Sequence, residues 1–159
     1  MASRHFRAGV VAVVERSDGA ILAFERSDAP GSWQLPQGGI EVGEEPEDTV
    51  WRELKEETGL TRSDVELVER HPHWVVYEWP AEVAAGRKGI GQVQRWFTFR
   101  VNDDGVEPSP DGSEFTAWKW VEPTWLITHV VGFRRPAYER VLGGRGDAAP
   151  DRRAAGLSG

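Results

Sequence analysis

Three glutamates in one short segment of the chain have the spacing that would bring their carboxylates together on a helix. They are Glu53, Glu56 and Glu57. At 100° per residue, with Glu53 placed at zero, Glu56 lies at about 300° and Glu57 at about 40°, so the three share an arc of ~100°. Val50 and Leu54 occupy the adjoining arc by the same spacing. The carboxylates are therefore expected along the edge of the buried helix face.

Such a concentration of negative charge calls for a counter-charge. Like charges three or four residues apart on a helix cost roughly 0.2 to 0.5 kcal/mol per pair, and more where they are partly desolvated. Hard divalent cations such as Mg²⁺ and Mn²⁺ prefer carboxylate oxygen, and Mg²⁺ commonly shares its coordination with substrate phosphates. Metal-assisted phosphoryl chemistry, with more than one ion per site, is one interpretation. A solvated acidic helix is the other.

The neighbouring residues predict how this helix is positioned. Pro46 favours a first helical position and Gly59 tolerates the left-handed conformation that ends helices, so the helix is expected from about Pro46 to Thr58. Residues 27–43 are rich in Gly, Pro, Ser and Asp and predict a long loop with brief extended pieces. Before that loop, two strands joined by a tight turn are expected over 7–15 and 20–25.

The rest of the chain alternates between strand-like and helix-like segments. Residues 65–79 and 93–101 are rich in β-branched and aromatic side chains and predict two long strands, with a Gly-rich connection over 85–91. A short strand is expected over 114–121, and one or two helical segments from Pro123 onward. This order predicts an α/β fold in which a mixed sheet lies between helices.

Length and charge limit the number of sites and the kind of partner. The 159 residues suit one domain, expected over 1–143, followed by a disordered tail over 144–159 that is poor in large apolar residues. The net charge of -7 argues against a DNA partner or a surface that coats nucleic acid, so RNA would be bound by its end.

No segment is apolar enough to span a membrane, and the absence of cysteine leaves only oxygen or imidazole for metal binding. A cytoplasmic protein is expected.

The spacing of residues 38–60, GGIEVGEEPEDTVWRELKEETGL, decides between the two interpretations of the acidic helix. Gly38, five residues, Glu44, seven residues and then the run from Arg52 to Leu60 match the Nudix signature in full, a coincidence expected on the order of once in a billion at a given start. The chain thus resembles the Nudix hydrolases. That resemblance implies a loop, helix and loop packed on a mixed sheet, with Mg²⁺ or Mn²⁺ as cofactor. It implies metal-binding roles for Glu53, Glu56, Glu57 and Gly38, and supporting roles for Glu44 and Arg52.

Outside the signature, the chain is similar to the branch of bacterial RNA pyrophosphohydrolases and dinucleoside polyphosphate hydrolases. The similar segments are SWQLPQGGI at 32–40, GQVQRWFTFRV at 91–101, EFTAWKWVEP at 114–123 and VVGFRRPAYERVL at 130–142. The resemblance implies a nucleotide polyphosphate or an RNA 5' end as substrate.

This closer resemblance also implies roles for single residues. Phe133 would stack on a base, Arg134 and Arg26 would contact phosphate, and Glu114 would bind a cation or act as the general base. Where the family has a phosphate-binding arginine near the N-terminus, this sequence has His5. Simpler interpretations compete: core packing for Phe133, a surface ion pair for Arg26 and an exposed strand end for Glu114.

Two questions stay open at this level. The substrate could be an RNA end or a dinucleoside tetraphosphate, and free nucleoside triphosphates or nucleotide sugars are alternatives. The domain could also sense a nucleotide without cutting it. Sensing modules commonly lose signature carboxylates, whereas every one of them is present here.

Overall fold

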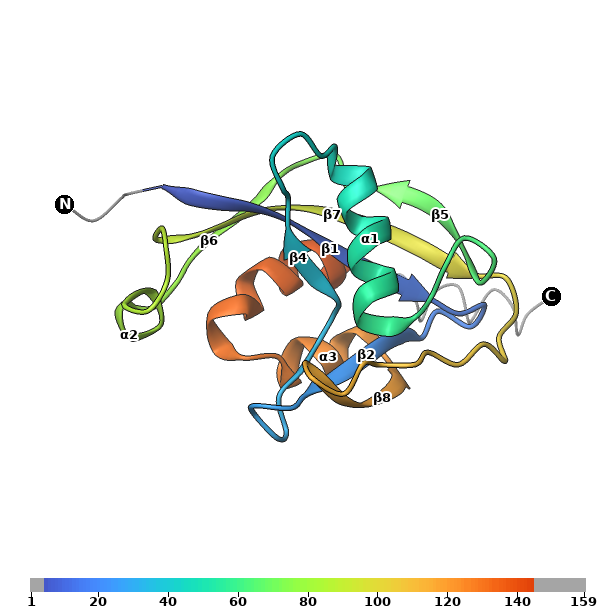
Figure 1. Cartoon of the computed structure of the whole chain (residues 1–159). Helices are drawn as coiled ribbons and strands as arrows, with labels where there is room; N and C mark the ends of the chain where they lie inside the picture. Colours follow the sequence, from blue (N-terminus) through green and yellow to red (C-terminus); the bar gives the residue numbers. More distant parts are fainter. Residues whose placement is uncertain (1–4, 145–159) are drawn as a thin grey trace.

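A mixed β-sheet with helices on both faces organises the chain (Figure 1). The computed structural model describes residues 5–144. The strands are β1 Phe6–Glu15, β2 Ile21–Arg26, β3 Trp33–Gln34, β4 Gln37–Gly39, β5 Val65–Arg70, β6 Val75–Glu78, β7 Gly91–Val101 and β8 Phe115–Val121. The helices are α1 Pro46–Thr58, α2 Ala81–Ala84, α3 Pro123–His129 and the 3₁₀ turn η1 Gly132–Arg134. A last helical segment runs from 135 to 144.

The first strand is the centre of the sheet. It pairs in parallel with β7 from Phe6↔Gly91 to Glu15↔Arg100, and antiparallel with β4 through Val10↔Gly38. The sheet order is β3-β2-β1-β7-β5, with β8 paired to β2 and β6 paired to β7. The sheet therefore mixes parallel and antiparallel pairs, as expected from the sequence.

Both faces of β1 are buried, which explains its nearly continuous apolar sequence. Val11 and Val13 belong to a core cluster that includes Leu126 of α3 and Tyr138 of the last helical segment. The alternate residues of β1 belong to a second cluster that includes Leu54 of α1. Helices thus cover the two faces of one mixed sheet, which confirms the predicted α/β architecture.

The segment between α1 and β7 departs from the expected pattern. The single strand predicted over 65–79 is wrong, because the chain breaks into β5 and β6 around His71–Trp74. Pro72 lies in that break, and proline has no N–H with which to continue a strand ladder. Both strands then pair with β7, one after the other. The short helix α2, which the sequence analysis did not anticipate, precedes the Gly-rich connection.

Two further expectations concern the limits of the chain. The disordered tail predicted over 144–159 falls, apart from residue 144, outside the described residues. Within residues 5–144, no helix has the length and apolarity needed to cross a membrane.

Candidate active site

The helix α1 carries the acidic residues, and local sequence sets both of its ends. Pro46 occupies the first turn, as predicted. Gly59 closes the helix with φ 76°, and its N–H donates to the carbonyl of Lys55. An added Cβ at Gly59 would also approach Ser109 to 3.3 Å. The helix therefore stops one residue after the last acidic turn, and Val50 and Leu54 fix its rotation by burying their side chains against the sheet.

A glycine opposite the helix makes room for the first carboxylate. Gly38 lies in β4, paired with Val10 of β1. A Cβ added at Gly38 would lie 2.0 Å from Cδ of Glu53, so any side chain there would displace the carboxylate. The role of Gly38 in the signature is thus steric in this structure: it lets Glu53 pack directly against the β4 backbone.

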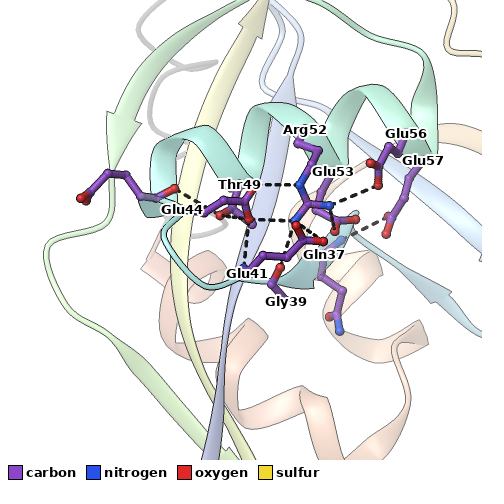
Figure 2. A network of polar contacts seen from close by, with 10 residues as sticks. Gln37, Gly39, Glu41, Glu44, Thr49, Arg52, Glu53, Glu56 and Glu57 are labelled. Atoms are coloured by element: carbon purple, nitrogen blue, oxygen red, sulfur yellow. Dashed lines mark hydrogen bonds and ion pairs between the residues drawn. The ribbon is translucent and has the colours of Figure 1, made fainter.

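One guanidinium, that of Arg52, organises the helix face (Figure 2). Its Nε and Nη2 donate to the two carboxylate oxygens of Glu44 at 2.7 and 2.9 Å. Its Nη1 donates to Glu53 at 2.8 Å and to Glu56 at 3.3 Å, and its Nη2 also donates to the carbonyl of Gly39 at 3.1 Å. Arg52 therefore ties the loop before α1 to the carboxylates on it, the supporting position expected from the signature.

Glu44 completes this network from the loop side. Besides Arg52, its carboxylate accepts hydrogen bonds from the Thr49 hydroxyl at 2.9 Å and from the backbone N–H of Glu41 at 3.0 Å. These donors, Arg52 first, lower the pKa of Glu44 to about 2. Glu44 is thus a fixed negative charge at neutral pH, and it serves to hold Arg52.

The last glutamate of α1, Glu57, contacts Glu114, the residue directly before β8. Glu57 is only 6% exposed, and its Oε2 accepts a hydrogen bond from the backbone N–H of Gln37 at 3.3 Å. Burial raises the pKa of Glu57, and a hydrogen bond and charge repulsion with Glu114 raise it further. Burial likewise raises the pKa of Glu53, against the opposing effect of Arg52. A buried carboxyl group in contact with a second carboxyl group creates a strong demand for a proton or a cation.

Backbone contacts hold Glu114 in that position. Its carbonyl accepts a hydrogen bond from the N–H of Ser27 at 2.8 Å, and its own N–H lies 3.3 Å from the carboxylate of Asp111. The residue itself is exposed, at the mouth of the site. Glu114 is therefore an accessible carboxylate beside a buried one, an arrangement that suits either predicted role, cation ligand or general base.

The residues present fit a divalent cation. Among residues 5–144, no three acidic or imidazole side chains converge with metal-ligand geometry as they stand. In their place, Arg52 spans Glu53 and Glu56, and Glu57 contacts Glu114. The donor set is entirely carboxylate oxygen, which is the preference of Mg²⁺ and Mn²⁺. The contact between the buried Glu57 and the exposed Glu114 marks where a cation would be most stabilising.

A polar cavity of about 340 Å³ opens beside these carboxylates. Gly38, Gly39 and Glu114 form its border with the acidic face. Four arginines also line it, from four separate parts of the chain: Arg7, Arg26, Arg87 and Arg134. A cationic cavity next to an acidic helix suits a ligand that carries several phosphates, with cations between the phosphates and the carboxylates.

Two of the predicted phosphate contacts, Arg26 and Arg134, lie in this cavity and have protein partners. Arg26 forms a two-pronged ion pair with Asp28, with N–O distances of 2.9 and 2.8 Å. Arg134 is 5% exposed and donates from Nη1 to Oε1 of Gln34 at 2.6 Å, while its buried Nε has no hydrogen-bond partner among the described residues. The ion pair expected as the simpler interpretation of Arg26 is present, inside the cavity.

The other two predicted substrate contacts, Phe133 and His5, lie outside the cavity lining. The Phe133 ring is partly buried against the core, 6.1 Å from the ring of Tyr77 and 5.3 Å from the guanidinium of Arg134. His5 is exposed, and its carbonyl accepts a hydrogen bond from the N–H of Ile90. Arg7, two residues further along β1, reaches the cavity instead.

Sequence reasoning missed the residues that the sheet brings in from a distance. Arg7 and Arg87 are separated by 80 positions in the chain and line one cavity because β1 pairs with β7 in parallel. Asp28 was likewise not singled out. The segment SWQLPQGG did carry a signal, since Gln34 holds Arg134 and the Gln37 backbone holds Glu57.

Comparison with known proteins agrees with this geometry. The family model described as the NUDIX domain matches residues 5–141. The RNA pyrophosphohydrolase of Cereibacter sphaeroides is 40% identical over 143 residues, which cover 86% of this chain and 88% of that protein. Nudix hydrolase 25 of Arabidopsis thaliana is 36% identical over 149 residues, covering 86% and 84% of the two chains.

A solved structure extends the similarity to the fold. The E. coli dihydroneopterin triphosphate pyrophosphohydrolase superposes with a TM-score of 0.70 at 20% identity, covering 86% of this chain and 97% of that one. At that identity the likeness concerns the fold alone. Nudix hydrolases generally use divalent metals, which agrees with the carboxylate donors on α1. On the match of the family model and the identity to its relatives, the chain belongs to the Nudix family.

Proposed function

We propose that this protein is a pyrophosphohydrolase that acts on 5'-triphosphorylated RNA ends, on dinucleoside polyphosphates, or on both. The observation that carries the proposal is that a negatively charged and a positively charged region lie side by side. The acidic face of α1 adjoins a cavity lined by four arginines, so a polyphosphate can lie between bound cations and guanidinium groups. Similarity to RNA pyrophosphohydrolases over most of the chain supports the same substrate class.

The proposed cofactor is Mg²⁺ or Mn²⁺, with more than one ion per site. Glu53, Glu56 and Glu57 would hold the ions, with the Gly38 backbone beside them. Bound cations would neutralise the phosphates, polarise a phosphoryl oxygen and favour deprotonation of the attacking water. The proposal needs Arg52 to release its contact to Glu56, the longer of the two that its Nη1 makes, while it keeps Glu44.

In the proposed reaction, the chain positions a water against one phosphorus. Glu114, accessible at the mouth of the site, accepts the proton of that water as the new P–O bond forms. The phosphoanhydride bond breaks and its electron pair leaves with the departing phosphate group. Arg134, buried with an unpartnered Nε, and Arg26 stabilise the negative charge of the phosphates. On an RNA 5' end, the products would be a monophosphorylated RNA and pyrophosphate.

The net charge of -7 leaves little positive surface for the body of an RNA. Each further phosphate contact would need a cation and would steepen the dependence on salt. We therefore propose recognition of the polyphosphate end and its first nucleotides, by a cytoplasmic enzyme with no DNA partner.

The deciding experiment is a substrate panel with Mg²⁺ and with Mn²⁺. It compares short and long triphosphorylated RNAs, a dinucleoside tetraphosphate, a nucleoside triphosphate and an ADP-sugar. We expect both proposed classes to be hydrolysed, the ADP-sugar to be poor and RNA length to matter little. Fastest hydrolysis of the ADP-sugar would reassign the substrate. Nucleotide binding without turnover of any compound would favour the sensing alternative.

A further inference from the structure

The strand β6 forms an open edge of the sheet. Among the described strands it pairs only with β7, whose opposite side is occupied by β1. The N–H of Trp79, directly after β6, donates to the carbonyl of Ile90. Because bonded and non-bonded positions alternate in an antiparallel ladder, the main-chain groups of Val76 and Glu78 point away from β7. Outside the strand ladders, no backbone hydrogen bond within residues 5–144 involves β6, so this edge can accept a further strand.

The two strands on this side of β7 differ in how their edges are protected. Charged side chains and bulges are the usual means of keeping an open edge from pairing with another chain. β5 has a bulge between Leu67 and Glu69. Its exposed charged residues are Glu66, Glu69 and Arg70. β6 has no such bulge and a single charge, that of Glu78 at its end, so its edge is the less protected of the two.

The exposed side chains along the β6 edge are mainly apolar. Trp74 and Val76 are 40% and 54% exposed. Alternate residues of a strand project from one face of a sheet, so Glu78 shares the face of Val76. Tyr77 projects from the other face, where its ring lies 6.1 Å from that of Phe133. A strand added to this edge would therefore cover apolar surface on the face opposite Phe133.

Two charges without an ion-pair partner lie at opposite ends of this edge. The guanidinium of Arg95 lies 5.4 Å from the ring centroid of Trp74. Glu78 lies at the other end of β6, opposite Gly91. In the part of the chain from 5 to 144, neither Arg95 nor Glu78 forms an ion pair. A strand that matches this edge must bring an acid to the Trp74 end and a base to the Glu78 end.

We propose that β6 pairs with the β6 of a second copy of this chain, antiparallel about a two-fold axis that passes between the two Val76 residues. In that register the main-chain groups that point away from β7 meet, and each Val76 exchanges hydrogen bonds with its counterpart. Trp74 then lies opposite Glu78 of the partner subunit, which brings that carboxylate to Arg95. The edge is complementary to itself in hydrogen bonding, apolar contact and charge, and the inference does not depend on the proposed function.

The extent of the strand sets the expected strength of association. β6 is four residues long, so the contact is smaller than a standard protein interface and a Kd in the micromolar range is expected. Sedimentation velocity at increasing protein concentration measures it. The sedimentation coefficient should rise from that of a monomer to that of a dimer. A monomer at every concentration up to about 1 mM would overturn the proposal.

A lysine at the two-fold axis tests the position of the interface. Val76→Lys places two like charges opposite each other and should raise the Kd for association at least about tenfold. Val76 is exposed, so thermal unfolding should be little changed. The matched control is Val68→Lys, the same change at an exposed valine of β5, which should leave the Kd unchanged. Equal weakening by both variants would show an effect of net charge alone and would contradict the proposal.

Exchanging the two charges tests the register. Glu78→Arg and Arg95→Glu should each raise the Kd about threefold or more, because every contact occurs twice in a symmetric dimer. The double variant should recover most of the loss. Glu66→Arg, the same charge change on β5, should have no effect. A double variant as weak as the single ones would refute the antiparallel pairing of Glu78 with the Trp74 end.

The absence of cysteine from the chain permits a direct test of geometry. Opposed Cα atoms in a hydrogen-bonded antiparallel pair are about 5.5 Å apart, which a disulfide can span. Val76→Cys should therefore form a covalent dimer under mild oxidation at least about tenfold faster than Val68→Cys. Equal rates for the two variants would overturn the proposal. Neither sedimentation nor crosslinking depends on hydrolysis, so the outcome stands whatever substrate the protein cleaves.

Discussion

The acidic face of α1 and the cationic cavity beside it differ in how their charged side chains are held. On the helix face, Arg52 holds three carboxylates from one stretch of chain, because its guanidinium donates hydrogen bonds to Glu44, Glu53 and Glu56. The cavity gathers its charges from residue 7 to residue 134, and part of them have no partner. The Arg52 network is therefore already formed within the protein, whereas the cavity leaves hydrogen-bond donors available to a ligand.

This difference determines how each region should respond to mutation. A closed network loses several contacts when one member changes, so its effects should be large and should fall on catalysis. An open set of cations contributes separately, so single changes there should be modest and should fall on substrate affinity.

The largest effect is expected for the carboxylates of α1. Glu56→Gln or Glu57→Gln should lower kcat by orders of magnitude with saturating Mg²⁺, because charge is lost at nearly constant shape. The protein should stay folded, since Glu57 is buried against Glu114 and a neutral side chain removes that repulsion. Turnover is measured beside thermal unfolding. Asp48→Asn, an exposed acid on the same helix, is the control, and near-normal turnover in either glutamine variant would refute the metal assignment.

The second largest effect is expected for Arg52→Lys, which keeps the positive charge but loses the forked arrangement of N–H donors. A lysine cannot bridge Glu44, Glu53 and Glu56 together. Activity or metal affinity should fall about ten- to hundredfold, the usual range for residues that orient metal ligands. The measurement is the Mg²⁺ concentration for half-maximal rate. A normal metal dependence would mean that the network is not needed to position the carboxylates.

A substitution at Phe133 tests whether the substrate also contacts residues outside the cavity lining. If it stacks on a base, Phe133→Ala should cost roughly 1 to 3 kcal/mol in kcat/KM. If its contacts with the core and Tyr77 dominate, the same change should instead cost about 3 to 5 kcal/mol of folding stability. Kinetics beside thermal melts distinguish the two. A large fall in Tm with unchanged catalytic efficiency would end the stacking hypothesis.

The smallest effect is expected at Asp28, whose carboxylate accepts two hydrogen bonds from the Arg26 guanidinium within the cavity. Its carboxylate is 66% exposed, and Arg26 lowers its pKa, so it competes as an anion with any phosphate. Asp28→Asn should lower the KM for a tetraphosphate substrate by up to about fivefold, the scale of an exposed ion pair. A higher KM would indicate that Asp28 serves to orient Arg26 for the substrate.

How much the sequence could predict follows the same division. The bounds of α1 and its arc of carboxylates depend on residues within one helix and its caps, and Pro46 and Gly59 were sufficient to place them. The order of strand-like and helix-like segments was similarly sufficient to predict a mixed sheet with helices on its faces.

The cavity residues and the division of the expected strand over 65–79 could not be predicted, because both depend on pairing between distant segments. Nothing local indicates that Arg7 lies opposite Gln92, and this register decides that Arg7, and not His5, reaches the cavity. The break around Pro72 divides one expected strand in two because both halves find places along the long β7. Tertiary pairing overrides strand propensity there.

The parallel pairing of β1 with β7 has a consequence for how the protein is made. β1 leaves the ribosome well before β7, which ends only at Val101, and Glu114 follows later still. Throughout that part of synthesis β1 is an apolar strand that lacks its longest partner, which favours delayed folding and makes chaperone binding advantageous. Because β4 pairs with β1, and Glu57 meets Glu114, a nascent chain cannot complete the active site before most of the domain has been translated.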